Sequence, residues 1–374
     1  MKIGIIGGGV SGTTFAINYQ RKHPQDEVLI FEHTDKLLKK ILSTGNGKCN
    51  IANAKELSRV YNDEYATSVI EKYNYHVQND FLNSLNIKTK LVNDLSYPIS
   101  ESAVTVRNAF LKEIDRLGIK IIDSVIVNDY KNKGERYQLF TDKGIFEVDT
   151  IIISVGGKSL PKSGSDGSFF TTLINHGYKI KDFNPGLCPI YTKEKTKILD
   201  GTRVKGKVSL FKEKQLVFEE IGEILFKEHG LSGIVIFNAS RIIAQDIDKN
   251  YKITIDLLPD VSKDELLAFL SSHDKSSLLE SYLHPNLVKY LLDFKGDIVS
   301  AIKGLPFTFD KLYGFENSQI SVGGVLLNNL NNKLESKLEK NVYFLGEAIN
   351  IDAPCGGYNL MWAIGSALYL SDRI

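Results

Sequence analysis

Apolar residues open the chain in a short run, residues 3–6, which predicts a buried β-strand. Glycines follow this run at once, and residues 13–21 have the apolar spacing of a helix. A second apolar run, residues 28–31, predicts another strand. Strand, helix and strand in this order predict the start of an α/β domain with a parallel sheet.

The middle of the chain alternates between the two kinds of spacing. Apolar residues three and four positions apart predict helices over residues 61–85 and 103–117. Strand-like runs cover residues 119–127, 137–140 and 145–154. The turn residues between the last two runs predict a hairpin.

The pattern changes again past residue 185, where short Lys-rich strands are followed by helical segments. Glycines and strands return toward the end of the chain. This order predicts an inserted, β-rich second domain over residues 186–310. The first domain is then discontinuous and consists of residues 1–185 and 311–374.

Composition narrows the class of protein. A chain of 374 residues with 43% hydrophobic residues is long enough for two domains with substantial cores. A net charge of +1 gives no overall attraction to nucleic acid or to acidic membranes. No apolar run approaches the roughly 20 residues that span a bilayer. We therefore predict a cytoplasmic protein without a membrane partner, and the oligomeric state stays open.

The three cysteines, Cys49, Cys188 and Cys355, cannot all pair with one another. None of them forms a C-x-x-C pair or a Cys/His spacing typical of a metal site. We predict reduced thiols and no metal.

The glycines after the first strand form a dinucleotide-binding fingerprint. Gly7 permits the tight turn, Gly9 lets the backbone approach a pyrophosphate, and Gly12 lets the helix pack closely on the strand. Glu32 ends the second strand, 20 residues after Gly12. A carboxylate there accepts hydrogen bonds from ribose hydroxyls, which favours FAD or NAD over a 2′-phosphorylated nucleotide.

A second glycine segment lies near the C-terminus. Residues 342–345 predict a strand that ends in Gly346 and Glu347, and a helix is predicted from Tyr358 onward. The start of such a helix directs N–H groups and a positive dipole end at whatever lies before it. Cys355 is a candidate proton donor beside a flavin, with a small buried filler residue as the alternative.

The ordered motifs resemble the bacterial BaiN/YhiN-like flavoproteins, which are NAD(P)/FAD-dependent or aminoacetone-oxidase-like oxidoreductases. The match covers nearly the whole chain, and the motifs that carry it are the fingerprint at residues 7–12, GNGKCN at 45–50, VGGKS at 155–159, GEILF at 222–226, GLSG at 230–233, GGV at 323–325, GE at 346–347 and GGYNL at 356–360. Lys48 stands where many members have Arg, which keeps the charge but removes the bidentate fork.

The resemblance implies a Rossmann-like FAD-binding domain of the glutathione-reductase type with an inserted substrate-side domain. It also implies a set of cofactor contacts. These are Gly7, Gly8, Gly9, Val10, Ser11, Gly12, Glu32, His33, Lys40, Asn46, Gly47, Cys49, Asn50, Val125, Val155, Gly156, Gly157, Gly346, Glu347, Gly357, Tyr358, Asn359 and Leu360.

Three functions fit these observations. The first is an FAD-dependent oxidoreductase that reduces an activated C=C bond, in a small molecule or in a uracil base of rRNA. The second is an FAD-dependent oxidase of a small amine or aminoketone, and the third is an RNA- or ribosome-binding protein with structural FAD.

Two further features bear on the reductant and the partner. Pro161 follows Val155-Gly156-Gly157 and interrupts the helix that a second fingerprint needs, so NADH or NADPH is expected only as a transient reductant. Residues 193–214 carry eight basic residues against three acidic ones. This excess could attract RNA, although a solvated Lys-bearing surface is the alternative.

Overall fold

The structure is a computed structural model that describes residues 1–55 and 59–374. It divides into two compact units. The first consists of Met1–Phe183 and Gln319–Ile374, and the second of Asn184–Ser318.

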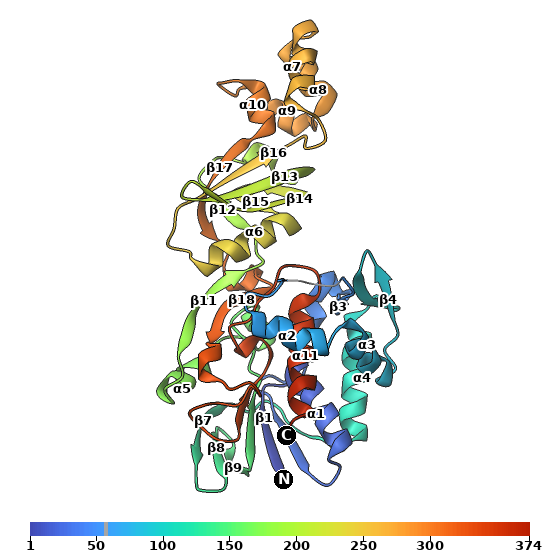
Figure 1. The fold of residues 1–374 in the computed structure, drawn as a ribbon, viewed down its shortest axis with the longest axis vertical. Coiled ribbons are helices and arrows are strands. Elements are labelled where there is room, and N and C mark those ends of the chain that lie inside the picture. The colour runs from blue at the N-terminus through green and yellow to red at the C-terminus, as the bar shows by residue number, and fades with distance from the viewer. Residues whose placement is uncertain (56–58) are drawn as a thin grey trace. The chain divides into compact units, whose positions relative to one another are not determined.

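A parallel sheet of five strands forms the centre of the first unit, in the order β19-β10-β1-β2-β6 (Figure 1). The strands are β1 (Lys2–Ile6), β2 (Glu27–Phe31), β6 (Lys120–Ile122), β10 (Thr150–Ile153) and β19 (Val342–Phe344). Ile5 and Ile152 point to one face of the sheet and Ile151 and Ile153 to the other, and all four are fully buried. Such burial on both faces explains why these strands are continuous apolar runs.

Different elements cover the two faces of this sheet. Helices α1 (Val10–Lys22) and α11 (Tyr358–Ser371) pack side by side on one face (Figure 1). The antiparallel sheet of β7 (Val127–Asn132), β8 (Tyr137–Thr141) and β9 (Gly144–Val148) lies against the other. The side chains of Val148 and Leu139 come within 3.0 and 3.1 Å of where a Cβ on Gly4 would lie, so the two sheets pack tightly at this position.

Other elements surround this core. They are β3 (Ala52–Asn53), α2 (Glu64–Lys72), α3 (Tyr75–Ser84), β4 (Thr89–Val92), β5 (Leu95–Pro98), α4 (Ala103–Arg116), α5 (Phe170–Asn175), β11 (Ile180–Gly186) and β18 (Ile320–Val325). β3, β5 and β4 form an antiparallel sheet, and β11 pairs with β18.

Three predicted elements are wrong in detail. The predicted strand 145–154 is divided into β9, which pairs with β8, and β10, which pairs with β1. The predicted strand 119–127 is divided into β6 and β7, because Ser124 adopts a left-handed backbone with φ of +51°. The predicted helix 61–85 is two helices, because the Asn74 side chain accepts hydrogen bonds from the N–H groups of His76 and Val77 and starts α3 anew.

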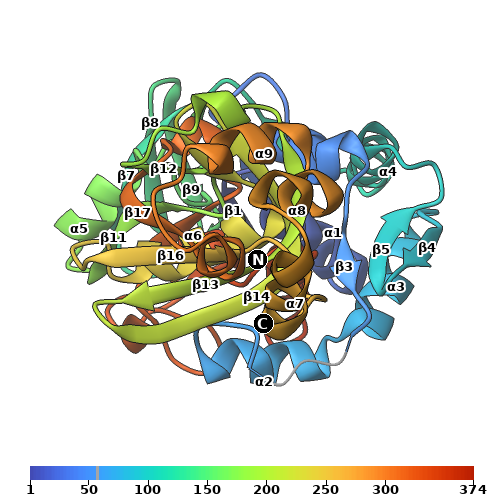
Figure 2. The same ribbon diagram turned by 90° about the horizontal axis from the view of Figure 1, so that it is seen from above.

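The second unit is a closed barrel with helices. Its strands follow the order β12-β15-β14-β13-β16-β17, and Figure 2 shows β13, β14 and β16 side by side. The strands are β12 (Ile190–Thr192), β13 (Arg203–Lys212), β14 (Gln215–Lys227), β15 (Gly230–Ser232), β16 (Tyr251–Asp256) and β17 (Leu305–Leu312). The helices are α6 (Ile234–Gln245), α7 (Lys263–Ser272), α8 (Lys275–Tyr282), α9 (Pro285–Leu292) and α10 (Ile298–Lys303).

Alternation along the barrel strands creates its core. Val208, Leu210, Ile224 and Phe226 are fully buried, whereas neighbours such as Lys207, Glu223 and Lys227 are polar and less buried. Across the described ranges, none of the helices has both the length and the apolar character that a bilayer span requires.

Candidate functional site

The glycine loop between β1 and α1 packs closely against the end of β10. Gly7 has φ of +103°, and a Cβ on it would lie 2.5 Å from the Ser154 carbonyl oxygen. A Cβ on Gly12 would lie 2.3 Å from the Gly7 carbonyl oxygen. Gly9 differs, because no heavy atom lies within 4 Å of where its Cβ would be. The loop is therefore closely packed at Gly7 and Gly12 and open at Gly9, where the fingerprint predicts a pyrophosphate.

The first turn of α1 meets the C-terminal glycine segment. No side chain caps α1 at Gly9, so the first N–H groups of the helix, beginning at Val10, depend on another partner. Gly346 has φ of +59°, and a Cβ on it would lie 2.8 Å from the Ser11 hydroxyl oxygen. The structure thus brings together glycine segments from the two ends of the chain.

Glu32 is connected to the glycine loop and to the segment that follows β2. Its side-chain oxygens accept hydrogen bonds from the N–H groups of Gly8 (2.9 Å) and Thr34 (2.8 Å). Its carbonyl accepts from the N–H of Val125 at 3.0 Å, and His33 Nδ1 lies 3.8 Å from the carboxylate. Glu32 is only 8% exposed, so its carboxylate is held in one orientation beside the loop.

Lys40 and Glu347 form an ion pair, with 2.6 Å between Lys40 Nζ and Glu347 Oε2. Lys40 also donates to the Ser159 hydroxyl. The other carboxylate oxygen of Glu347 accepts from the Ser321 N–H at 2.7 Å. A Cβ on Gly157 would lie 2.7 Å from the Ser321 hydroxyl oxygen. The predicted cofactor contacts Lys40, Gly157 and Glu347 therefore lie in one cluster.

The segment after β10 does not build a second dinucleotide fingerprint. Val155 is partly buried, and Gly156 has φ of +72°. The chain then forms a short 3₁₀ turn, Pro161–Ser163, in place of an α-helix. Proline at this position has the effect that the sequence predicted.

The loop before β3 is a 3₁₀ segment, Lys40–Gly47, interrupted by left-handed residues at Gly45 and Asn46. Asn46 is exposed and Gly47 is partly exposed. Cys49 is fully buried, and burial raises the pKa of its thiol to about 11. The thiol is therefore protonated at neutral pH, and Cys49 is a poor nucleophile in this structure. Lys48 forms a 2.9 Å ion pair with Glu101.

The turn before α11 is held by asparagines from β3 and the loop before it. With its amide in the hydrogen-bonding orientation, Asn50 accepts from the Gly357 N–H at 3.2 Å and donates to the Ala52 carbonyl at 3.0 Å. Asn53 donates to the Gly356 carbonyl at 2.9 Å. These side chains fix the backbone of the turn from the outside.

The first turn of α11 is anchored in the same way. The Asn359 amide donates to the Ala353 carbonyl and accepts from the Ala353 N–H, at 2.8 and 3.0 Å. The Tyr358 carbonyl accepts from the buried Tyr61 hydroxyl at 2.9 Å. Leu360 lies partly buried in this turn. The Asn359 side chain is therefore committed to the loop that precedes the helix.

Cys355 lies three residues before α11 rather than in its first turn. It is partly exposed, and its Sγ lies 3.9 Å from Gln319 Oε1. It forms no disulfide.

Three residues near these loops were not found from the sequence. Ser154 Oγ donates to the Gly7 carbonyl at 2.8 Å, Asn53 holds Gly356, and Ser165 lies against Gly156. Ser154 ends a predicted strand beside the glycines, so its position was a usable signal. Asn53 and Ser165 carry no local signal, because only the folded chain brings them to these loops.

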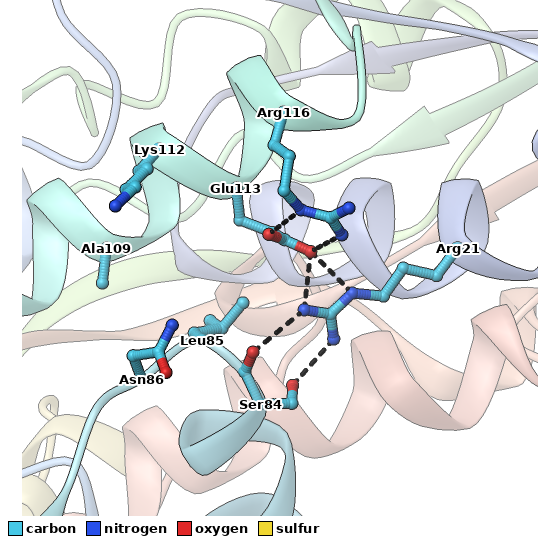
Figure 3. A pocket seen from close by; sticks show the side chains of 8 residues that line it. All are labelled: Arg21, Ser84, Leu85, Asn86, Ala109, Lys112, Glu113 and Arg116. Atoms are coloured by element: carbon cyan, nitrogen blue, oxygen red, sulfur yellow. Dashed lines mark hydrogen bonds and ion pairs between the residues drawn. The ribbon is translucent and has the colours of Figure 1, made fainter.

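A hollow of about 230 Å³ lies elsewhere in the first unit and is drawn in Figure 3. Two arginines converge there on Glu113: Arg21 Nε donates at 2.8 Å, and Arg116 Nε at 2.7 Å. Arg21 also donates to the Ser84 hydroxyl at 2.7 Å. These guanidinium groups are occupied by protein partners, so the cluster joins α1, α3 and α4 and offers little for a ligand.

The Lys-rich segment 193–214 is less positive in the structure than in the sequence. Four of its basic side chains form ion pairs with acids outside the segment: Lys197 with Glu228, Arg203 with Glu223, Lys207 with Glu219, and Lys212 with Asp246. Glu219 and Glu223 come from β14, Glu228 follows β14, and Asp246 ends α6. Their pairing lowers the net charge available to an RNA backbone.

Comparison with known families identifies the relatives of this chain. The profile of the family described as "HI0933-like protein Rossmann domain" matches residues 1–372. The chain belongs to this family. It is 30% identical over 402 residues to the 3-dehydro-bile acid delta(4,6)-reductase of Clostridium scindens, covering 100% of this chain and 98% of the relative. It is 23% identical to the ribosomal RNA dihydrouridine synthase of Haemophilus influenzae, covering 97% and 96%.

Two solved structures share the fold. The FrdA chain of Escherichia coli quinol fumarate reductase aligns with a TM-score of 0.50 and 10% identity, covering 100% of this chain and 70% of that one. A 3-ketosteroid-delta4-(5alpha)-dehydrogenase from Rhodococcus jostii aligns with a TM-score of 0.50 and 10% identity, covering 99% and 96%. The predicted family, the α/β fold with a Rossmann-like unit and the class of FAD-dependent oxidoreductase are confirmed.

Proposed function

We propose that this protein is an FAD-dependent reductase of an activated C=C bond. The observation that carries the proposal is the alignment over the whole chain with a family relative whose name describes a delta(4,6)-reductase, a reductase of ring double bonds. A single dinucleotide loop at Gly7–Gly9–Gly12 supports one resident cofactor.

The described residues fit FAD. The open space at Gly9 and the uncapped start of α1 suit a pyrophosphate, because helix N-termini favour anions. Glu32 suits the ribose hydroxyls, since its carboxylate is held beside the glycine loop. The start of α11 at Tyr358 suits the ring end, where its dipole would stabilise negative charge.

When bound, FAD would supply hydride transfer to the substrate. The residues of the chain would then orient the substrate double bond and deliver a proton to the neighbouring carbon. Cys355 is our candidate for that proton, because it is a partly exposed thiol just before α11. NADH or NADPH would act as a transient reductant at the same site, since the residues that follow Gly157 form a 3₁₀ turn instead of a fingerprint helix.

For the substrate we favour a small conjugated ketone over RNA. The relative with a small-molecule name is 30% identical, against 23% for the relatives named as rRNA dihydrouridine synthases. The ion pairs of residues 193–214 also weaken the case for a phosphate-binding surface. The second unit, Asn184–Ser318, is our candidate for the substrate-side domain. A uracil base in rRNA is the second candidate substrate.

The test is anaerobic reduction of the FAD-loaded protein. We expect NADH or NADPH to bleach the 450 nm flavin band, and a 3-keto-Δ4 steroid to restore it with loss of the steroid double bond. Restoration by rRNA with formation of dihydrouridine would favour the second substrate. Bleaching by an aminoketone alone would overturn the proposal in favour of an oxidase. Retention of RNA by a protein that neither nicotinamide reduces would favour a binding protein with structural FAD.

The role of Cys355 is tested separately. Cys355→Ser should lower the rate of double-bond reduction about 100-fold while FAD content stays normal, because a serine hydroxyl is a much weaker acid than a thiol. Cys188→Ser, at a buried cysteine of the second unit, is the matched control. An unchanged rate in Cys355→Ser would eliminate Cys355 as the proton donor.

A further inference from the structure

Ser165 has a buried hydroxyl without a hydrogen-bond partner. The residue is 6% exposed, and its Oγ is buried and has no hydrogen-bond partner among the described residues. Leaving such a group unsatisfied costs on the order of 1–3 kcal/mol. A hydroxyl retained at this cost suggests a partner that binds after folding.

The surroundings of Ser165 point to the predicted cofactor site. A Cβ on Gly156 would lie 2.9 Å from Ser165 Oγ and 4.0 Å from Glu347 Oε2, so both oxygens lie on one side of Gly156. Gly164, the residue before Ser165, lies close to Glu32, the residue predicted to bind the ribose hydroxyls. A Cβ on Gly164 would lie 3.0 Å from the Thr34 methyl carbon and 3.5 Å from Glu32 Oε1.

The backbone around Ser165 is fixed without help from its hydroxyl. The 3₁₀ turn Pro161–Ser163 leads into Gly164, which has φ of +100°. On the other side, the Asp166 carboxylate accepts from the N–H and the hydroxyl of Ser168, at 2.9 and 2.7 Å. The segment thus places Ser165 Oγ beside Gly156 and the preceding residue, Gly164, near Glu32, and it leaves the Ser165 hydroxyl available.

We propose that Ser165 binds the adenosine diphosphate half of the cofactor by donating a hydrogen bond to a phosphate or ribose oxygen. This inference rests on the proposed function, because it requires FAD in the site. Because the preceding residue, Gly164, lies close to Glu32, we assign Ser165 to the ADP half rather than to the flavin ring. Neither the sequence motifs nor the comparisons assign this residue.

The experiment measures FAD and ADP affinity in flavin-stripped protein carrying Ser165→Ala. Loss of one hydrogen bond to a charged oxygen should weaken both FAD and ADP roughly tenfold. The melting temperature of the stripped variant should stay equal or rise, because the unsatisfied hydroxyl is gone. Ser163→Ala is the matched control: its hydroxyl donates to the Leu160 carbonyl at 2.7 Å inside the turn, and its FAD affinity should stay normal.

Each other outcome has a definite meaning. Equal FAD affinity in Ser165→Ala and wild type overturns the inference and leaves the proposed function standing. Weaker FAD binding with unchanged ADP binding overturns the assignment to the ADP half. A stripped variant that melts earlier, with normal FAD affinity, would show that the hydroxyl serves only the fold. If wild-type protein takes up no FAD, the proposed function and this inference both fail.

Discussion

The loop of residues 7–12 is shaped by its own backbone and the strand beside it, whereas the turn at residues 356–357 is held by side chains from another part of the chain. In the first, the carbonyl oxygens of Ser154 and Gly7 leave no room for a side chain at Gly7 and at Gly12, respectively. In the second, Asn50 and Asn53 bind the backbone of the turn. Both segments need glycine for steric reasons, because a Cβ on Gly357 would lie 2.7 Å from the Ala52 carbonyl oxygen. The difference is that two asparagine side chains also hold the second turn.

The largest effect should come from filling the crowded side of the first loop. In Gly12→Ala the new methyl would lie 2.3 Å from the Gly7 carbonyl oxygen and 2.5 Å from the Ser154 hydroxyl oxygen. Because both oxygens are fixed by packing, we expect the free energy of unfolding to fall by about 3 kcal/mol or more. Urea denaturation of flavin-stripped protein measures this, and stability equal to that of wild type would refute rigid packing of the loop.

Gly9→Ala is the matched substitution on the open side. No heavy atom lies within 4 Å of its new methyl, so stripped protein should lose no more than about 1 kcal/mol. FAD affinity should nevertheless fall on the order of 100-fold, because the methyl would occupy the space predicted for the pyrophosphate. Fluorescence titration with FAD checks this. Normal affinity would mean that the cofactor does not approach Gly9.

The turn near the C-terminus should respond to a distant side chain. Asn50→Ala removes the partners of the Gly357 N–H and the Ala52 carbonyl, and we expect a loss of about 2 kcal/mol in the free energy of unfolding. Ser43→Ala, at an exposed residue of the same loop, should cost no more than about 0.5 kcal/mol. Equal stability of the two variants would show that Asn50 does not hold the turn.

The smallest effect concerns the far end of α1, the helix that begins at the first loop. Hydrogen bonds from Arg116, together with Arg21, hold the pKa of Glu113 below the ordinary glutamate value of 4.5. A depressed carboxyl pKa contributes stability above the unfolded value, and this contribution is lost as the pH falls through the folded value. Glu113→Gln should therefore be less stable than wild type by about 1 kcal/mol at pH 7.

Below the ordinary glutamate pKa this difference should shrink toward zero, and FAD affinity should be unchanged throughout. Denaturation series at several pH values, with FAD titration at pH 7, give both quantities. A difference in stability that persists in acid would mean that packing, rather than charge, joins α1 to α4. A change in FAD affinity would mean that the first loop depends on the far end of its helix.

Sequence and structure agree best where the interactions are local. The strand, glycine loop and helix at residues 2–22 follow from apolar spacing and from the need for glycine at crowded backbone positions. Pro161 likewise prevents a helix after β10 wherever the chain folds around it. In residues 119–127 apolar spacing did not predict the interruption of the strand, because a single left-handed residue, Ser124, divides it.

The sequence by itself determined the α/β core and the dinucleotide fingerprint, because backbone sterics and apolar periodicity act over a few residues. Only the tertiary structure decided how the ends meet, with Gly346 against Ser11 and Lys40 paired with Glu347. It also decided that barrel pairing neutralises lysines such as Lys207, and that Ser165 keeps an unsatisfied hydroxyl. Such contacts depend on hydrogen-bond and ion-pair partners that lie far apart in the sequence.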